Sequence, residues 1–130
     1  MNDLEEAVRL YENYKSHISF GIHLNLTEGD PLIFSEQLAE SGLYKIINGK
    51  NVFNVNNFRY KYLSPKIEKE LYKELDAQIT TILDTGIKPS HIDSHHHIHN
   101  GISILPVVVS LAKNTKYEKL ETFVIICLPL

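Results

Sequence analysis

Apolar residues change their spacing several times along the 130-residue chain, and each change marks the start of a new predicted element. The first apolar residues repeat every three to four positions, as on the buried face of a helix: Leu4, Ala7, Val8, Tyr11 and Tyr14. Asn2 or Asp3 can cap this helix, and two glutamates follow in its first turn. We therefore expect a helix that ends near Lys15.

Apolar and polar residues then alternate from Ile18 to Thr27, which predicts a strand with one apolar face. The residues of the apolar face are Ile18, Phe20, Ile22, Leu24 and Leu26. The opposite face has small polar side chains and one imidazole, that of His23. The strand should end in the loop 28–31, which contains glycine and proline.

A longer helix is expected between Ser64 and Gly86, because Pro65 stands at its first position and apolar residues follow helical spacing: Ile67, Leu71, Leu75, Ile79, Ile82 and Leu83. A short strand should follow at 90–95, and a further helix at 102–113 with residues 107–109 buried. The sequence of residues 35–41 predicts a short helix. The sequence of residues 44–58 indicates an insertion with a hairpin or an irregular loop. This alternation of helices and strands is typical of an α/β domain with parallel strands.

The last segment, residues 114–130, fits this pattern poorly. It can hold one more strand, 122–126, but no closing helix follows that strand. We therefore expect residues 1–130 to form a single, incomplete α/β domain. An apolar edge left exposed in such a domain would favour self-association, so a homo-oligomer is one expected outcome.

Composition restricts the chemistry that the chain can perform. Hydrophobic residues make up 43% and charged residues 22% of the chain, as in ordinary globular proteins. The net charge is −3 and the sequence has no basic stripe, which argues against nucleic acid as a partner. Cys127 is the one cysteine, which excludes an internal disulfide and thiolate zinc sites. The N-terminus is acidic and no apolar run is long enough to cross a bilayer, so we expect a cytoplasmic protein without a membrane partner.

Five of the seven histidines lie between His91 and His99. The cluster is internal and alternates with Ile, Asp and Ser, so it is not a purification tag, although a solvated polar loop remains an alternative. On a continuous strand, four groups would share one face: His91, Asp93, His95 and His97. Burial of all four would be costly, and a divalent ion bound by neutral imidazoles would relieve that cost. The segment is too short for every histidine to reach one ion, so the others would orient ligands or face the substrate.

His23 is the second candidate, because it lies on the polar face of its strand beside Asn25 and Thr27. A lone histidine on a strand is more often structural than a ligand, but α/β folds place their sites at the carboxyl ends of parallel strands. If both strands belong to one sheet, His23 and His95 should converge there. Asp93 can orient an imidazole or act as a base, whereas His17 is expected to be incidental.

Two segments resemble the YdjC-like family of carbohydrate deacetylases: GIHLNLTEGDPL at 21–32 and KPSHIDSHHHIH at 88–99. The resemblance implies removal of N-acetyl groups from amino sugars such as diacetylchitobiose, within a (β/α) barrel that here would be partial. It also implies a divalent metal ion, Mg²⁺ or Zn²⁺, bound by His23 and His95. His97 and His99 would line the site; we expect Asp93 and His97 to take part in catalysis, and Asn25, Thr27 and His99 to line the bound sugar.

The chain departs from the family pattern in one respect that affects function. The family begins with a strand that contains Asp-Asp followed by Phe-Gly, which supplies the third ligand and the base, and no such pair occurs here. We therefore expect an internal fragment that also lacks the C-terminal half of the barrel. Three hypotheses follow: a deacetylase that depends on further parts, a non-catalytic metal- or sugar-binding fragment, or another metal-dependent hydrolase such as a phosphoesterase. A phosphoesterase needs phosphate donors, and the two arginines, Arg9 and Arg59, lie outside both segments.

Overall fold

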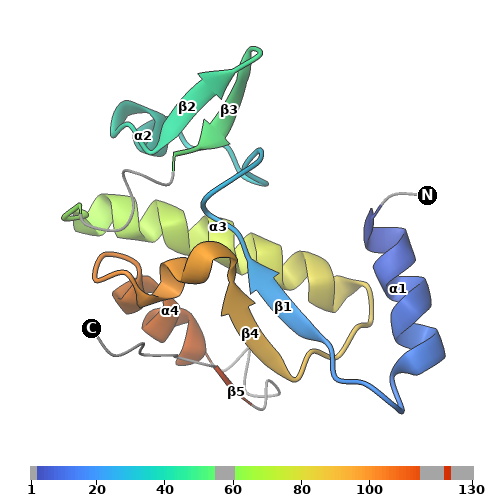
Figure 1. Cartoon of the computed structure of the whole chain (residues 1–130). Helices are drawn as coiled ribbons and strands as arrows, with labels where there is room; N and C mark the ends of the chain where they lie inside the picture. Colours follow the sequence, from blue (N-terminus) through green and yellow to red (C-terminus); the bar gives the residue numbers. More distant parts are fainter. Residues whose placement is uncertain (1–2, 55–60, 115–121, 124–130) are drawn as a thin grey trace.

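The computed structural model describes residues 3–54, 61–114 and 122–123 of the chain. Figure 1 shows its elements in chain order: α1 (Asp3–Tyr14), β1 (Gly21–Leu24), α2 (Glu36–Glu40), β2 (Tyr44–Ile47), β3 (Lys50–Phe53), α3 (Pro65–Asp84), β4 (His91–Ser94), the 3-10 helix η2 (His95–Asn100), α4 (Leu105–Ala112) and β5 (Thr122–Phe123). Each helix and strand expected from the sequence has a counterpart, although several bounds differ. Residues 55–58 of the expected insertion and 124–126 of the expected last strand lie outside the described residues.

The central sheet has three parallel strands in the order β1, β4, β5. In the pairing of β1 with β4, Gly21 lies opposite His91 and His23 lies opposite Asp93. The expected α/β class with parallel strands is therefore confirmed. Within the described residues the sheet does not close on itself, so the barrel stays a prediction.

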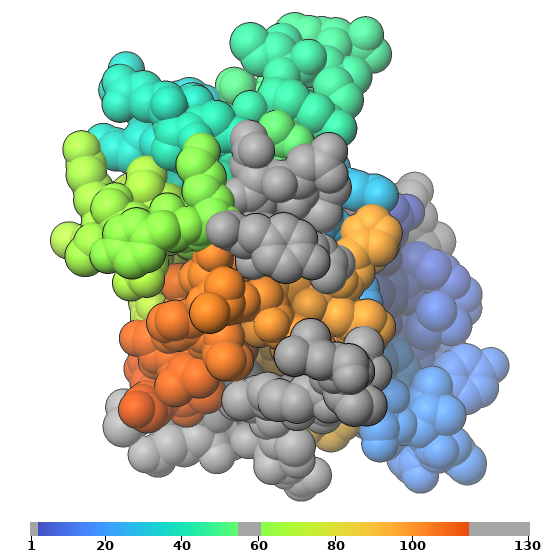
Figure 2. Space-filling model, turned by 60° about the vertical axis from the view of Figure 1, so that its left-hand side comes forward, coloured from blue at the N-terminus to red at the C-terminus, as the bar shows by residue number. Residues whose placement is uncertain are grey.

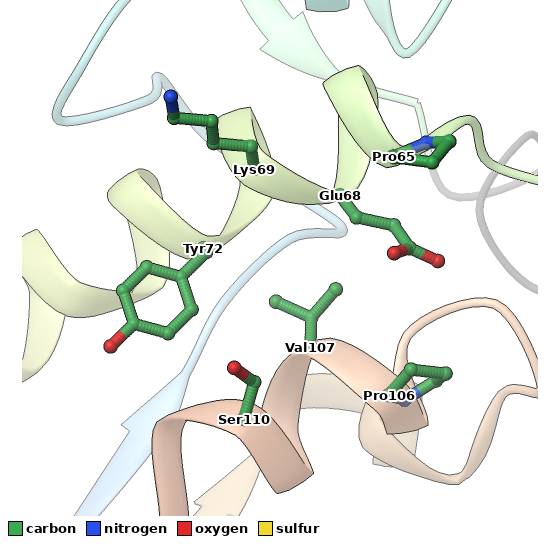
Figure 3. Close-up of a pocket in the computed structure, with 7 residues that line it drawn as sticks. All are labelled: Pro65, Glu68, Lys69, Tyr72, Pro106, Val107 and Ser110. Atoms are coloured by element: carbon green, nitrogen blue, oxygen red, sulfur yellow. The ribbon is translucent and has the colours of Figure 1, made fainter. Parts of the chain in front are cut away.

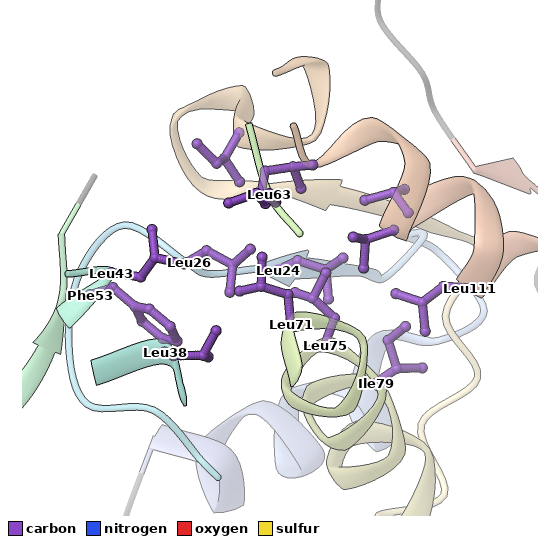
Figure 4. Packing of buried hydrophobic residues seen from close by; sticks show 14 of the residues in the cluster. Leu24, Leu26, Leu38, Leu43, Phe53, Leu63, Leu71, Leu75, Ile79 and Leu111 are labelled. Carbon is purple, nitrogen blue, oxygen red and sulfur yellow. The ribbon is translucent and has the colours of Figure 1, made fainter. Parts of the chain in front are cut away.

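Helix α3 packs on the sheet through the predicted apolar stripe. Leu71, Leu75 and Ile79 are fully buried, and Figure 4 shows Leu71 and Leu75 beside Leu24 of β1 and Ile79 beside Leu111. Each such side chain stabilises the fold by roughly 1.5–3 kcal/mol when it is removed from water. The Ser64 side chain accepts the N–H of Ile67 at the helix start, and Gly86 takes φ 86° just after its end.

Helix α2 and the β2–β3 hairpin form a separate projection, which Figure 2 shows above the rest of the molecule. The hairpin is antiparallel and turns at Asn48 and Gly49, whose φ angles are 51° and 76°. Positive φ at both central residues is the requirement of the tight turn that best matches strand twist. Phe53 and Leu38 join this projection to the main core, where both are buried.

The two predicted buried faces near the N-terminus are confirmed only in part. Helix α1 buries Tyr11 alone, against the ring of Phe20 with centroids 5.1 Å apart, while Tyr14 is half exposed. Ile18 is 53% exposed, since its N–H bonds to the carbonyl of Tyr14 and so continues the end of the helix. The first strand therefore begins at Gly21 rather than Ile18.

The C-terminal helix is shorter than expected. It begins at Leu105 and buries Val107 and Val108, whereas Ile102 precedes it and is 80% exposed. In the described ranges, no helix has both the length and the apolar composition to span a bilayer.

Candidate functional site

The carboxyl ends of β1 and β4 lie side by side, because the two strands are parallel and His23 is in register with Asp93. In β1 the apolar residues Ile22 and Leu24 are buried and His23 points to the exposed side, as its position in the alternation predicted. Parallel strands of α/β folds present their functional side chains at this edge. The polar residues that follow both strands therefore gather in one place.

His23 and His95 converge at this edge as expected. The Nε2 atom of His23 lies 3.3 Å from the Nδ1 atom of His95, and the two ring centroids are 5.5 Å apart. These residues are separated by 72 positions in the sequence. Their proximity depends entirely on the pairing of the two strands.

The prediction that His95 and His97 continue the strand is wrong. The strand ends at Ser94, and residues 95–100 form a 3-10 helix that is kinked where His96 and His97 adopt φ angles of 53° and 51°. Two consecutive left-handed residues reverse the backbone, so alternation no longer decides which way these side chains point. Ile98 then returns to the core, where it is 1% exposed.

Asp93 lies between two histidines of this turn. Its Oδ1 atom is 3.8 Å from Nδ1 of His97 and 3.8 Å from Nδ1 of His99. The His97 side chain is 51% exposed, whereas that of His99 is 4% exposed. The carboxyl group can thus interact with one imidazole that reaches solvent and one that does not.

His99 is fixed by Ser94. The Ser94 Oγ atom accepts the backbone N–H of His99 at 3.1 Å and lies 2.5 Å from the ring Nδ1. Burial lowers the pKa of the His99 imidazole below its usual value, and the nearby charge of Asp93 opposes this shift. Among the described residues, the buried Nε2 atom of His99 has no hydrogen-bond partner.

The loop after β1 contributes the other side of the site. The Asn25 side chain organises this loop: its Oδ1 accepts the N–H groups of Thr27 at 3.0 Å and Glu28 at 3.2 Å, and its Nδ2 donates to the Glu28 carbonyl. Thr27 is buried, and its Oγ1 lies 3.1 Å from Nδ1 of His96. The expected role of Asn25 and Thr27 in lining the substrate stays a prediction.

Two side chains of α3 form hydrogen bonds with backbone groups of this loop. Gln78 accepts the N–H of Asn25 at 2.9 Å and donates to its carbonyl at 2.8 Å. The buried carboxylate of Glu74 accepts the N–H groups of Leu32 at 3.1 Å and Ile33 at 2.7 Å, and a third bond from Gln78 at 2.8 Å. The loop is therefore anchored to the helix at both of its ends.

The donor set at the sheet edge fits a divalent ion. Two imidazole nitrogens on one tetrahedral zinc, each at about 2.0–2.1 Å, are roughly 3.3 Å apart, which matches His23 and His95. A second grouping adjoins it, since ligand atoms of Glu28, His95 and His96 all lie within 4.8 Å of one another. His95 belongs to both arrangements. Its Nδ1 faces His23, while its Nε2 lies 3.6 Å from the Glu28 carboxylate.

Sequence reasoning missed Glu28 and His96 as residues of this edge. Glu28 lies within the first of the two segments that resemble the family, so a carboxylate just beyond a strand that contains a histidine could have been noticed. The position of His96 depends on its left-handed backbone, which histidine adopts more often than most residues but still too rarely to be predicted from the sequence.

Among the hollows that adjoin α3, two lie on different sides of the helix. One, of about 300 Å³, has His23, Asn25 and Gln78 among its lining residues, so it opens beside the site. The other, of about 270 Å³, lies between α3 and α4, and Figure 3 shows Tyr72, Glu68 and Val107 on its walls. None of the predicted site residues lines this second hollow.

The fold and the site define an α/β protein with a histidine-rich cluster at the carboxyl edge of a parallel sheet. The family model described as YdjC-like protein matches residues 1–126. The chain therefore belongs to the YdjC-like family, in agreement with the resemblance of its two segments.

Similar proteins carry deacetylase names. A carbohydrate deacetylase of Brevibacillus brevis is 33% identical over 87% of this chain and 41% of its own length. A carbohydrate deacetylase of Clostridium beijerinckii is 36% identical over 94% of this chain and 51% of its own length. A chitooligosaccharide deacetylase of Proteus mirabilis is 32% identical over 85% of this chain and 40% of its own length. A crystal structure from Enterococcus faecalis V583, named for cellobiose-phosphate cleavage, has a TM-score of 0.61 at 26% identity and covers 83% of this chain and 40% of that one. The chain spans between two fifths and about half the length of these proteins.

Proposed function

We propose that the carboxyl edge of β1 and β4 is part of a carbohydrate deacetylase site that hydrolyses the acetamide of N-acetylated amino-sugar oligosaccharides with a divalent ion. The observation that supports this most directly is the 3.3 Å approach of His23 Nε2 and His95 Nδ1 at the edge where α/β proteins place their sites. The deacetylase names of the relatives supply the substrate class.

His23 and His95 would hold the ion, which is Mg²⁺ or Zn²⁺ in this proposal. Imidazole donors suit Zn²⁺ better than Mg²⁺, which prefers oxygen ligands. Such an ion would polarise the acetamide carbonyl and lower the pKa of a water molecule.

Asp93 and His97 are the proposed proton-transfer pair. The exposed ring of His97 can reach a bound substrate and donate a proton to the departing sugar amine, while the Asp93 carboxyl group, 3.8 Å from its Nδ1, orients the ring. His99 supports this arrangement as a buried neutral imidazole held by Ser94. Asn25 would border the sugar, whereas Thr27 and His99, which are both 3% exposed, would shape this part of the site from within.

The second candidate function is binding of metal or sugar without turnover. The sequence contains no Asp-Asp pair, which the family resemblance implies as the source of the base. A phosphoesterase is less well supported, because Arg9 forms an exposed ion pair with Glu6 on α1 and Arg59 lies outside the described residues.

Binding of di-N-acetylchitobiose and of its fully deacetylated counterpart tests the proposal. We expect the acetylated disaccharide to shift the NMR signals of His23, His95 and His97 in the presence of Zn²⁺, and the deacetylated one to shift them much less. Equal responses to both sugars, or no response, would contradict a deacetylase site. Acetate release should be very slow or absent; robust turnover by this chain would instead show that it contains its own base and would exclude the binding-only function.

A further inference from the structure

Glu28 faces the ring nitrogen of His95 that is turned away from His23. Its Oε2 atom lies 3.6 Å from Nε2 of His95, on the side opposite to the Nδ1 atom that approaches His23. The distance exceeds a hydrogen bond by about half an ångström. The Glu28 side chain is 66% exposed, so rotation about its own bonds can close this gap.

The two nitrogens of a neutral imidazole cannot both bind a metal ion, because one of them carries the ring proton. For Nδ1 of His95 to share an ion with His23, the proton must reside on Nε2. A carboxylate next to Nε2 stabilises that tautomer and fixes the plane of the ring.

The position of Glu28 is itself determined by the fold. Asn25 binds both the N–H and the carbonyl of Glu28, and Gln78 binds both backbone groups of Asn25. Because Gln78 also bonds to the buried carboxylate of Glu74, the loop is held against α3 at the point from which Glu28 reaches His95.

We infer that Glu28 is a positioning residue for His95: it binds the Nε2–H group and thereby directs Nδ1 toward the ion shared with His23. This inference rests on the proposed role of His23 and His95 as metal ligands. It differs from a site in which Glu28 is itself a ligand together with His95 and His96, whose donor atoms are also close enough for that.

Ring tautomers provide a test that does not depend on activity. Long-range ¹H–¹⁵N NMR of the metal-free chain should show the His95 proton predominantly on Nε2, and Glu28→Ala should shift the ring toward a mixture of both tautomers. Glu40→Ala, which removes an exposed carboxylate on α2, is the matched control and should leave His95 unchanged. An unchanged tautomer in Glu28→Ala would overturn the inference, whether or not the chain binds metal.

Zn²⁺ titration supplies the second readout. We expect Glu28→Ala to weaken Zn²⁺ binding by about 10–100-fold, the usual effect of removing a residue that orients a ligand. Glu28→Gln, which keeps an oxygen acceptor without the charge, should lose less Zn²⁺ affinity than Glu28→Ala. Glu40→Ala should bind Zn²⁺ with the affinity of wild type. Binding of Zn²⁺ to Nε2 of His95, visible in the ¹⁵N shifts, would make Glu28 a ligand and overturn its positioning role. If His23→Ala weakens binding but Glu28→Ala does not, the inference fails alone and the proposed metal site stands.

Discussion

Replacement of Glu74 by alanine tests whether α3 holds the loop that forms one side of the site. The Glu74 carboxylate is 1% exposed and accepts three N–H groups, from Leu32, Ile33 and Gln78. A hydrogen bond to a charged group contributes roughly 1.5–3 kcal/mol to stability. Three such bonds at the lower end of that range amount to about 4.5 kcal/mol.

The observed loss should be smaller than this sum, because water can reach the partly exposed loop and removal of a buried carboxylate also removes its desolvation cost. We expect Glu74→Ala to lower the free energy of unfolding by about 3 kcal/mol. Glu74→Gln should lose about 1–2 kcal/mol, because its amide keeps one acceptor oxygen but turns an N–H group toward an N–H donor.

Urea unfolding followed by circular dichroism measures both values, with a similar m-value expected for all variants. Lys69→Ala, an exposed truncation on the same helix, should change stability by less than about 0.5 kcal/mol. If Glu74→Ala were as stable as Lys69→Ala, the three bonds would not anchor the loop and this reasoning would be refuted.

Three further predictions concern the sheet, the cluster and the core. A Cβ atom at Gly21 would lie 2.3 Å from Nε2 of His91 across the sheet, so Gly21→Ala should displace that ring and lower stability by about 1 kcal/mol in the same urea assay; an unchanged midpoint would show that the ring moves freely. Because burial lowers the pKa of His99, the pKa measured by NMR titration should fall below the usual 6.5. The contribution of His99 to stability should then be complete above pH 6.5 and be lost as the pH falls below that value. A measured pKa at or above 6.5 would refute the account of its burial. Phe53→Ala should cost about 3–5 kcal/mol, because Phe53 is 1% exposed where the hairpin joins the core; a loss below about 1 kcal/mol would mean that the hairpin is not part of that core.

The sequence predicts those parts of the fold that depend on local pattern. The helix that begins at Pro65 has its cap, its proline and its buried stripe within one segment, and the structure agrees closely. The outward direction of His23 follows from strict alternation inside a strand, and that alternation holds between Gly21 and Leu24.

The remaining features depend on contacts between distant segments. The turn at His96 and His97 requires left-handed backbone, which Ile98 and His99 accompany by packing into the core. Histidine is enriched among non-glycine residues with positive φ, but such residues are too uncommon for the sequence to predict two in succession. The bonds between Gln78 and Asn25 join residues 53 positions apart, so the support beneath the loop cannot be inferred from spacing. The position of Glu28 beside His95 depends on that support.

The central claim, that His23 and His95 share a divalent ion, is tested most directly by calorimetric titration with Zn²⁺. We predict one ion per wild-type chain and a loss of affinity of more than about tenfold in both His23→Ala and His95→Ala. His17→Ala, which alters an exposed histidine bonded to its neighbour Ser16, should bind as wild type does. Equal affinity in wild type and His23→Ala would contradict the account, because the ion would then be bound elsewhere.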